Sequence, residues 1–191
     1  VMEGLPDIIA FLQGTKCKPI SFNYCRPSLN NGKVECNNAT PQEMVAHTLS
    51  SYALVKDSGL ACAYNFMLPL CLLPVAFLRE LITRKIITTI CQMQTQNGLI
   101  FSPEGNWIAC NHLYDYPLGK FSVDFDDADS FMAFQKRKEV QAVYQGLTAL
   151  PDVRCRECSL VKNCGGGCAI QYLQHSSEEL LGKPFAKGEV I

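Results

Sequence analysis

The segment CRECSLVKNCGGGC, residues 155–168, holds four of the eleven cysteines of this chain. Cys155 and Cys158 have the Cys-x2-Cys spacing that turns two sulfurs toward one point, and Cys164 and Cys168 follow after five and three intervening residues. Thiolates at such spacings bind soft ions, either zinc or the iron of an iron-sulfur cluster. The three glycines before Cys168 favour a cluster, because a bulky anionic group needs close backbone approach and N–H groups aimed at its sulfurs.

Two more cysteines stand upstream in a regular frame, with thirteen residues between Cys91 and Gly105 and four between Gly105 and Cys110. The β-prone runs 99–101 and 106–109 are joined by Ser-Pro-Glu-Gly, a turn with Pro at its second position and Gly at its fourth. This pattern predicts a β-hairpin that brings Cys91 near Cys110.

The complete frame, Cys-x13-Gly-x4-Cys, a gap, and then Cys-x2-Cys-x5-Cys-x3-Cys, resembles the SPASM domain of radical S-adenosylmethionine enzymes that mature peptides and proteins. The resemblance implies two auxiliary [4Fe-4S] clusters that accept an electron or bind substrate, while a 5′-deoxyadenosyl radical abstracts a substrate hydrogen. In this reading Cys91, Cys110 and Cys168 match ligands of the first cluster, and Cys155, Cys158 and Cys164 match ligands of the second.

The chain departs from the family pattern at three places. Asn97 stands where the family often has a cysteine after the first one, and no cysteine follows Cys168. Compared with the family pattern, each cluster lacks one protein ligand. Truncation near Ile191 would account for this at the second cluster. At the first, the alternatives are an open iron site that binds substrate or water and a substitute ligand, His112 or Asp115. Asn111 replaces the Asp that acts as the base in sulfatase-maturing relatives, which argues against that substrate.

The remaining cysteines lack the Cys-x3-Cys-x2-Cys spacing that holds the catalytic cluster of radical S-adenosylmethionine enzymes. We expect them to be small buried side chains in or beside apolar runs, without a role; they are Cys17, Cys25, Cys36, Cys62 and Cys71. The chain is therefore expected to be the C-terminal part of a longer enzyme and inactive alone. S-adenosylmethionine and a third cluster belong, on the same resemblance, to the intact enzyme.

The first half alternates predicted strands and helices. The expected elements are a helix at 6–13, a strand at 19–25, a loop at 26–38, a helix starting at a Thr40–Glu43 capping box, an apolar strand within 60–68 and a helix at 75–85. Such alternation favours a parallel sheet, although two units cannot close a barrel. The resemblance implies that residues 1–88 are the last part of a partial (β/α) barrel.

The second half has a different character. Residues 89–191 are expected to form a small cysteine-rich SPASM domain of the α+β class, with the hairpin, a helical pattern at 129–147 and another after Cys168. The fold class is thus α/β followed by α+β.

Composition excludes several classes of partner. Charged residues make up 18% of the chain and the net charge is -1, so nothing favours nucleic acid or an acidic membrane surface. The longest apolar run, 66–78, is interrupted by prolines and too short to span a bilayer. The N-terminus lacks the pattern of a signal peptide, and we expect a cytoplasmic protein. The resemblance adds a peptide or protein substrate and an electron donor such as a flavodoxin or ferredoxin.

Two other hypotheses remain open at this stage. The cysteines could form a structural zinc site in a non-enzymatic peptide-binding module, since four close thiols satisfy tetrahedral zinc. The chain could also be a stand-alone electron carrier. Metal and acid-labile sulfide analysis separates the zinc hypothesis from the two iron-sulfur hypotheses.

Overall fold

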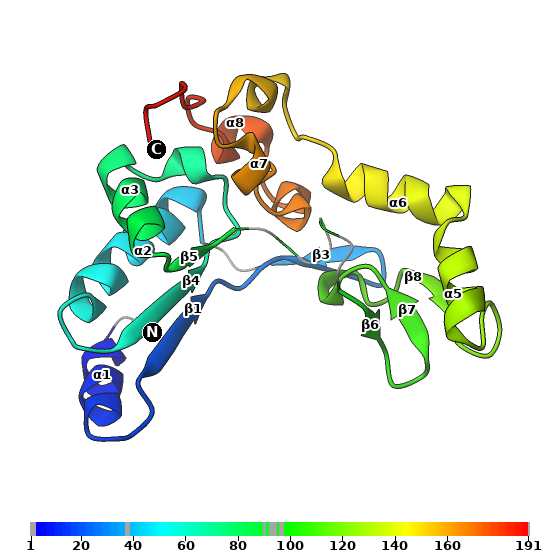
Figure 1. The fold of residues 1–191 in the computed structure, drawn as a ribbon, viewed down its shortest axis with the longest axis horizontal. Helices are drawn as coiled ribbons and strands as arrows, with labels where there is room; N and C mark the ends of the chain where they lie inside the picture. The colour runs from blue at the N-terminus through cyan, green and yellow to red at the C-terminus, as the bar shows by residue number, and fades with distance from the viewer. Residues whose placement is uncertain (1–2, 37–38, 90, 92–94, 96–97, 191) are drawn as a thin grey trace.

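The computed structural model describes residues 3–36, 39–89, 91, 95 and 98–190, and these form a mixed α/β structure with three small sheets (Figure 1). The first half builds a three-stranded parallel sheet in the order β1-β4-β5, which does not close into a barrel. Its elements are α1 (Leu5–Gln13), β1 (Pro19–Asn23), α2 (Pro41–Val55), β4 (Ala61–Asn65), the 3-10 helix η1 (Leu70–Leu72), α3 (Val75–Thr83) and β5 (Ile87–Thr88).

The helices and strands predicted for the first half are confirmed, and their local causes are visible. At the start of α2, the Thr40 hydroxyl accepts the Glu43 N–H at 3.2 Å, and the Glu43 carboxylate accepts the Thr40 N–H at 2.8 Å. This reciprocal pair satisfies two backbone donors that a helix start leaves open. Pro41 occupies the first helical position, where a missing N–H costs nothing.

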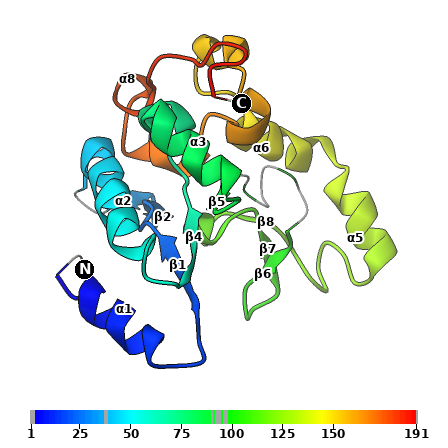
Figure 2. The same cartoon turned by 60° about the vertical axis from the view of Figure 1, so that its left-hand side comes forward.

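One face of the parallel sheet is covered and the other is open. Tyr64 on β4 is fully buried and stacks on Phe22 of β1 with ring centroids 4.7 Å apart, and α2 and α3 pack over these rings (Figure 2). The opposite face carries small or polar exposed side chains, namely Ser21, Asn23, Ala61 and Ala63. A parallel sheet normally has both faces covered, so this open face is unusual.

The polar stretch 26–38, expected to be a loop, contains a short hairpin instead. Strands β2 (Ser28–Asn30) and β3 (Lys33–Glu35) pair antiparallel around Asn31 and Gly32, whose φ angles are +49° and +74°. Asn-Gly is the pair most suited to a two-residue turn with left-handed backbone at both positions. Polarity alone predicts a loop at 26–38, whereas the Asn31-Gly32 pair favours the turn of a hairpin.

In the second half, the predicted hairpin is confirmed. Strands β6 (Ile100–Phe101) and β7 (Asn106–Ile108) pair antiparallel, and β8 (Pro117–Lys120) extends the sheet beyond β7. Gly105 has φ +79°, the left-handed conformation that its place in the turn requires. Trp107 is fully buried against Phe131, with ring centroids 4.8 Å apart.

The helical pattern at 129–147 forms two helices, α5 (Ala128–Gln135) and α6 (Lys138–Thr148). Arg137 between them has extended backbone, with φ -61° and ψ 143°, and its guanidinium lies over the Phe134 ring at 4.6 Å. The break lets Phe134 join the aromatic core around Trp107 while α6 takes a new direction (Figure 1).

The cysteine-rich segment connects two hydrophobic cores. It comprises the short elements η3 (Val153–Glu157), α7 (Val161–Cys164), η4 (Ala169–Leu173) and α8 (Ser177–Leu180). Cys164 packs in the core of the parallel-sheet half, whereas Cys168 packs in the core around Trp107. The Cys168 N–H donates to the carbonyl of Met67 at 2.8 Å, which ties this segment to the loop after β4.

Over the described part of the chain, none of the helices combines the length and the apolar character that crossing a lipid bilayer requires.

Candidate metal centre

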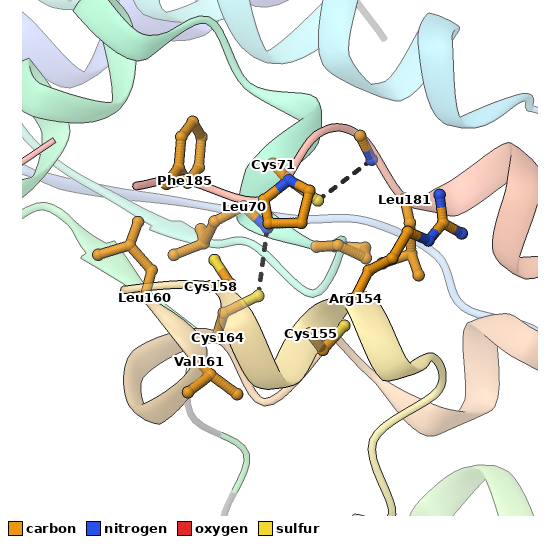
Figure 3. Close-up of a pocket in the computed structure, with 14 residues that line it drawn as sticks. Leu70, Cys71, Arg154, Cys155, Cys158, Leu160, Val161, Cys164, Leu181 and Phe185 are labelled. Atoms are coloured by element: carbon orange, nitrogen blue, oxygen red, sulfur yellow. Dashed lines mark hydrogen bonds between the residues drawn. The ribbon is translucent and has the colours of Figure 1, made fainter. Parts of the chain in front are cut away.

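The structure gathers Cys155, Cys158 and Cys164 around one cavity (Figure 3). Asp152 caps η3 by accepting the Arg154 N–H at 2.8 Å, and this turn carries Cys155. The Cys158 N–H then donates to the Cys155 carbonyl at 3.3 Å, which gives the Cys-x2-Cys loop its tight turn. Cys164 is the last residue of α7, and the spacing of five residues is the length needed to return to the same cavity.

A fourth thiol, Cys71 on η1, lines the same cavity. Sequence analysis assigned this residue no role, because Leu70-Cys71-Leu72 reads as part of an apolar run. Its neighbours in the cavity are far away in the chain: the Gly182 N–H, 111 residues along, donates to the Cys71 Sγ at 3.2 Å. No local sequence signal marks this contact, so only the tertiary structure identifies Cys71.

Backbone N–H groups point at the sulfurs of this site. The Leu70 N–H donates to the Cys164 Sγ at 3.3 Å, shown dashed in Figure 3. Burial raises the pKa of the Cys164 thiol, and the N–H groups of Leu70, Gly166 and Gly167 act in the opposite direction because they favour the thiolate. Sulfur ligands of iron-sulfur clusters receive such N–H bonds, which also tune the reduction potential.

Glycines allow the backbone to approach these thiols. A Cβ on Gly166 would lie 2.4 Å from the Pro151 Cδ, and a Cβ on Gly167 would lie 2.8 Å from the Pro69 Cδ. Both glycines have left-handed backbone, with φ +80° and +86°. Any other residue would push the segment away from the cavity, so the glycine run is required by the packing here.

The ionisation of Cys71 reflects its surroundings. Burial raises its pKa to about 11, the Gly182 N–H opposes this, and ionised Cys164, Cys155 or Cys158 would raise the pKa further. These mutual effects act between like charges that share one space. The four thiols that line this cavity are soft donors, so their chemistry suits a thiolate-bound metal group, which would displace the thiol protons on binding.

The other three predicted ligands form a second, separate group. Cys110 follows β7 and Cys168 precedes η4; both are buried, and Cys91 is half-buried against the same core. Burial raises the pKa of Cys110; the His112 N–H lowers it, while Cys168 and Cys91 would raise it when ionised. Cys91 likewise raises the pKa of Cys168. Cys91, Cys110 and Cys168 thus lie in one neighbourhood, in or against the core around Trp107.

Arg26 supplies positive charge beside this second group. It opposes the effect of burial on both Cys110 and Cys168 by lowering their pKa values. Its buried Nε has no hydrogen-bond partner among the described residues. An anionic group between these thiols would supply the missing negative charge.

The proposed substitute ligands differ in where they lie. The Asp115 carboxylate accepts the Asn31 N–H at 2.7 Å and thus binds the β2–β3 turn. His112 is half-buried, and burial, together with the Arg26 charge, lowers its pKa. Asn111 begins the 3-10 helix η2 (Asn111–Leu113) and is exposed. Asn97 lies outside the described residues.

The expectation that these thiols are buried is wrong for three cysteines. Cys17, Cys25 and Cys36 are exposed, while Cys62 and Cys71 are half-buried. The exposed three lie in connections beside α1, β1 and β3, where apolar neighbours in sequence do not become neighbours in the core.

In the part of the chain described, no three His, Cys, Asp or Glu side chains form a group that could hold a metal ion. Tetrahedral zinc requires four thiolates about 2.3 Å from one centre. A [4Fe-4S] cluster distributes its thiolates over four irons, so its ligands stand farther apart. Among the described residues, the thiols are therefore not gathered as closely as a single metal ion needs.

Comparison with protein-family models, with curated proteins and with solved structures finds no match to this chain.

Proposed function

We propose that this chain is the auxiliary-cluster portion of a radical S-adenosylmethionine enzyme that modifies a peptide or protein substrate. The observation that carries the proposal is the division of the six framed cysteines. Cys155, Cys158 and Cys164 share one cavity, and Cys91, Cys110 and Cys168 share another neighbourhood. The same division follows from the SPASM spacing, although the sequence frame interleaves the two groups.

In this function the protein holds thiolates that are partly or fully buried, with backbone N–H groups or a positive charge nearby. Leu70 and Gly182 donate to sulfur at the first site described, and Arg26 offsets negative charge at the other. An auxiliary [4Fe-4S] cluster supplies one-electron chemistry or an iron for substrate binding when it is present. Burial and the number of N–H···S bonds set its reduction potential.

The open face of the parallel sheet supports the part of the proposal that assigns residues 1–88 to a partial (β/α) barrel. Ser21, Asn23, Ala61 and Ala63 lie on that face, and the Asn65 Nδ2 donates to the side-chain Oδ1 of Asn23 at 2.8 Å. A parallel sheet with helices on one face and the other face uncovered has the arrangement of a partial (β/α) barrel. The small and polar side chains on the uncovered face differ from the bulky branched ones that fill a complete barrel. Further strands, the catalytic cluster and S-adenosylmethionine belong to the intact enzyme in this proposal. Its partners are a peptide or protein substrate and a flavodoxin or ferredoxin.

The test is iron and acid-labile sulfide in anaerobically purified and reconstituted protein. Two [4Fe-4S] clusters correspond to about eight iron and eight sulfide per chain. The double variant Cys155→Ala/Cys158→Ala should lose about half of each. The matched control, Cys17→Ala/Cys36→Ala, removes two exposed thiols and should change neither.

Two outcomes would contradict the proposal. Wild-type protein without iron and sulfide would exclude the auxiliary clusters, and one zinc without sulfide would identify the zinc-stabilised peptide-binding module instead. Iron content that the double variant leaves unchanged would overturn the two-site assignment.

A further inference from the structure

We propose that Cys71 is the fourth protein ligand of the cluster held by Cys155, Cys158 and Cys164. The inference rests on the proposed function and adds a ligand that the spacing of the cysteine frame does not contain. It places one ligand in the loop between β4 and α3, outside the segment that holds the other three.

The first argument is the number of ligands. A [4Fe-4S] cluster bound entirely by protein takes four thiolates. Cys155, Cys158 and Cys164 supply three thiols around this cavity. Cys168 packs with Cys110 and Cys91 in the other core. A cluster at this cavity therefore has a place for one further protein ligand.

The second argument is position. Cys71 lines the cavity that the three motif cysteines line, as Figure 3 shows. The remaining lining side chains are apolar, apart from Arg154, and glycine supplies backbone only. Among the described residues lining this cavity, Cys71 is the one additional side chain with an atom that binds iron.

The third argument is the backbone around Cys71. Pro69 and Pro74 flank the η1 turn, which fixes its course across the cavity. Gly182 approaches so closely that a Cβ there would lie 2.3 Å from the Cys71 carbonyl oxygen. Its N–H donates to the Cys71 Sγ at 3.2 Å, the same type of contact that Leu70 makes with Cys164. Cys71 thus receives the same type of N–H···S contact as Cys164, and it also packs against the core.

The deciding experiment is thiol labelling of the reconstituted wild-type chain with iodoacetamide, read by mass spectrometry before and after iron removal with a chelator. We expect Cys71 to be protected together with Cys155, Cys158 and Cys164 while the cluster is present. Chelation should release all four. Cys62 is half-buried to a similar degree and reports any general loosening of the fold.

A single substitution measures how much of the bound iron and sulfide depends on Cys71. Cys71→Ala should lose about half of the bound iron and sulfide, the loss also expected for Cys155→Ala/Cys158→Ala, while Cys62→Ala should keep the wild-type content. If Cys71→Ala does not fold, labelling of the wild-type chain still decides.

The possible outcomes distinguish failure of the proposed function from failure of Cys71 as a ligand. Wild-type protein that binds no iron and sulfide overturns the proposed function and this ligand together. Iron and sulfide that bind through Cys155, Cys158 and Cys164, with Cys71 labelling that changes no more on chelation than Cys62 labelling, overturn Cys71 alone.

Discussion

At the residue scale, two glycines illustrate how close packing decides the effect of a methyl group. A Cβ on Gly119 in β8 would lie 2.6 Å from the Phe134 ring, whereas a Cβ on Gly146 in α6 would meet nothing within 4 Å. Gly119 therefore permits the sheet to contact the aromatic core, and Gly146 only weakens its helix.

These positions give opposite predictions. Gly119→Ala should lower the free energy of unfolding by about 1–3 kcal/mol, because overpacking displaces Phe134. Gly146→Ala should raise it by about 0.5–1 kcal/mol, because alanine loses less conformational freedom in a helix. Urea unfolding of both variants measures the two effects, and equal shifts would contradict the packing argument.

Tyr52 gives a prediction on pH. Its hydroxyl donates to the Glu80 Oε1 at 2.7 Å, and burial, with a smaller effect from Glu80, raises its pKa to about 12. An unfolded tyrosine ionises near pH 10, as estimated from model peptides. The stabilisation is therefore complete below about pH 10 and is lost as the pH rises toward 12, because the unfolded state releases its proton first.

The comparison is with Tyr52→Phe, which cannot ionise. The free energy of unfolding of this variant should fall less steeply between about pH 10 and 12 than that of wild type. Urea titrations across this range measure both slopes, and parallel curves would show that Tyr52 does not contribute.

At the element scale, α2 depends on the capping box at its start. Thr40→Ala removes the side chain that accepts the Glu43 N–H and should cost about 1 kcal/mol of stability. Gln42→Ala, an exposed change in the same turn, should stay within about 0.5 kcal/mol of wild type. Thermal unfolding distinguishes them, and a Thr40→Ala melting point equal to that of Gln42→Ala would refute the cap.

At the scale of the whole molecule, residues 164–168 connect the two hydrophobic cores. Gly167 has left-handed backbone and lies against Pro69, while Gly188 has left-handed backbone with no neighbour within 4 Å of its Cβ position. Alanine at either position suffers the same backbone strain. The difference in stability between the two variants therefore measures the cost of the close contact between residue 167 and Pro69.

We expect Gly167→Ala to destabilise the chain by about 1–3 kcal/mol more than Gly188→Ala. It should also lower the iron content at the Cys71 site, because Pro69 precedes η1 and would move with it. Urea unfolding and iron analysis of both variants test this. Equal stability and equal iron would show that the segment tolerates displacement.

The sequence alone predicted the features that depend on residues close together in the chain. The Thr40–Glu43 box, the Gly105 turn and the alternation of strands and helices each depend on residues within a few positions of one another, and each is confirmed. The Asn31-Gly32 turn carried an equally local signal, and the prediction of a loop there was wrong because polarity outweighed turn chemistry.

What only the tertiary structure decided is the grouping of distant side chains. Whether an apolar segment buries an inert thiol or presents it to a cavity depends on which backbone packs against it. Cys71 and Gly182 meet across 111 residues. Cys164 and Cys168 separate into two cores over three glycines. The cysteine spacing led to the prediction of cluster chemistry, which stays a prediction. Long-range packing, which no local pattern encodes, decided which thiols share a cavity.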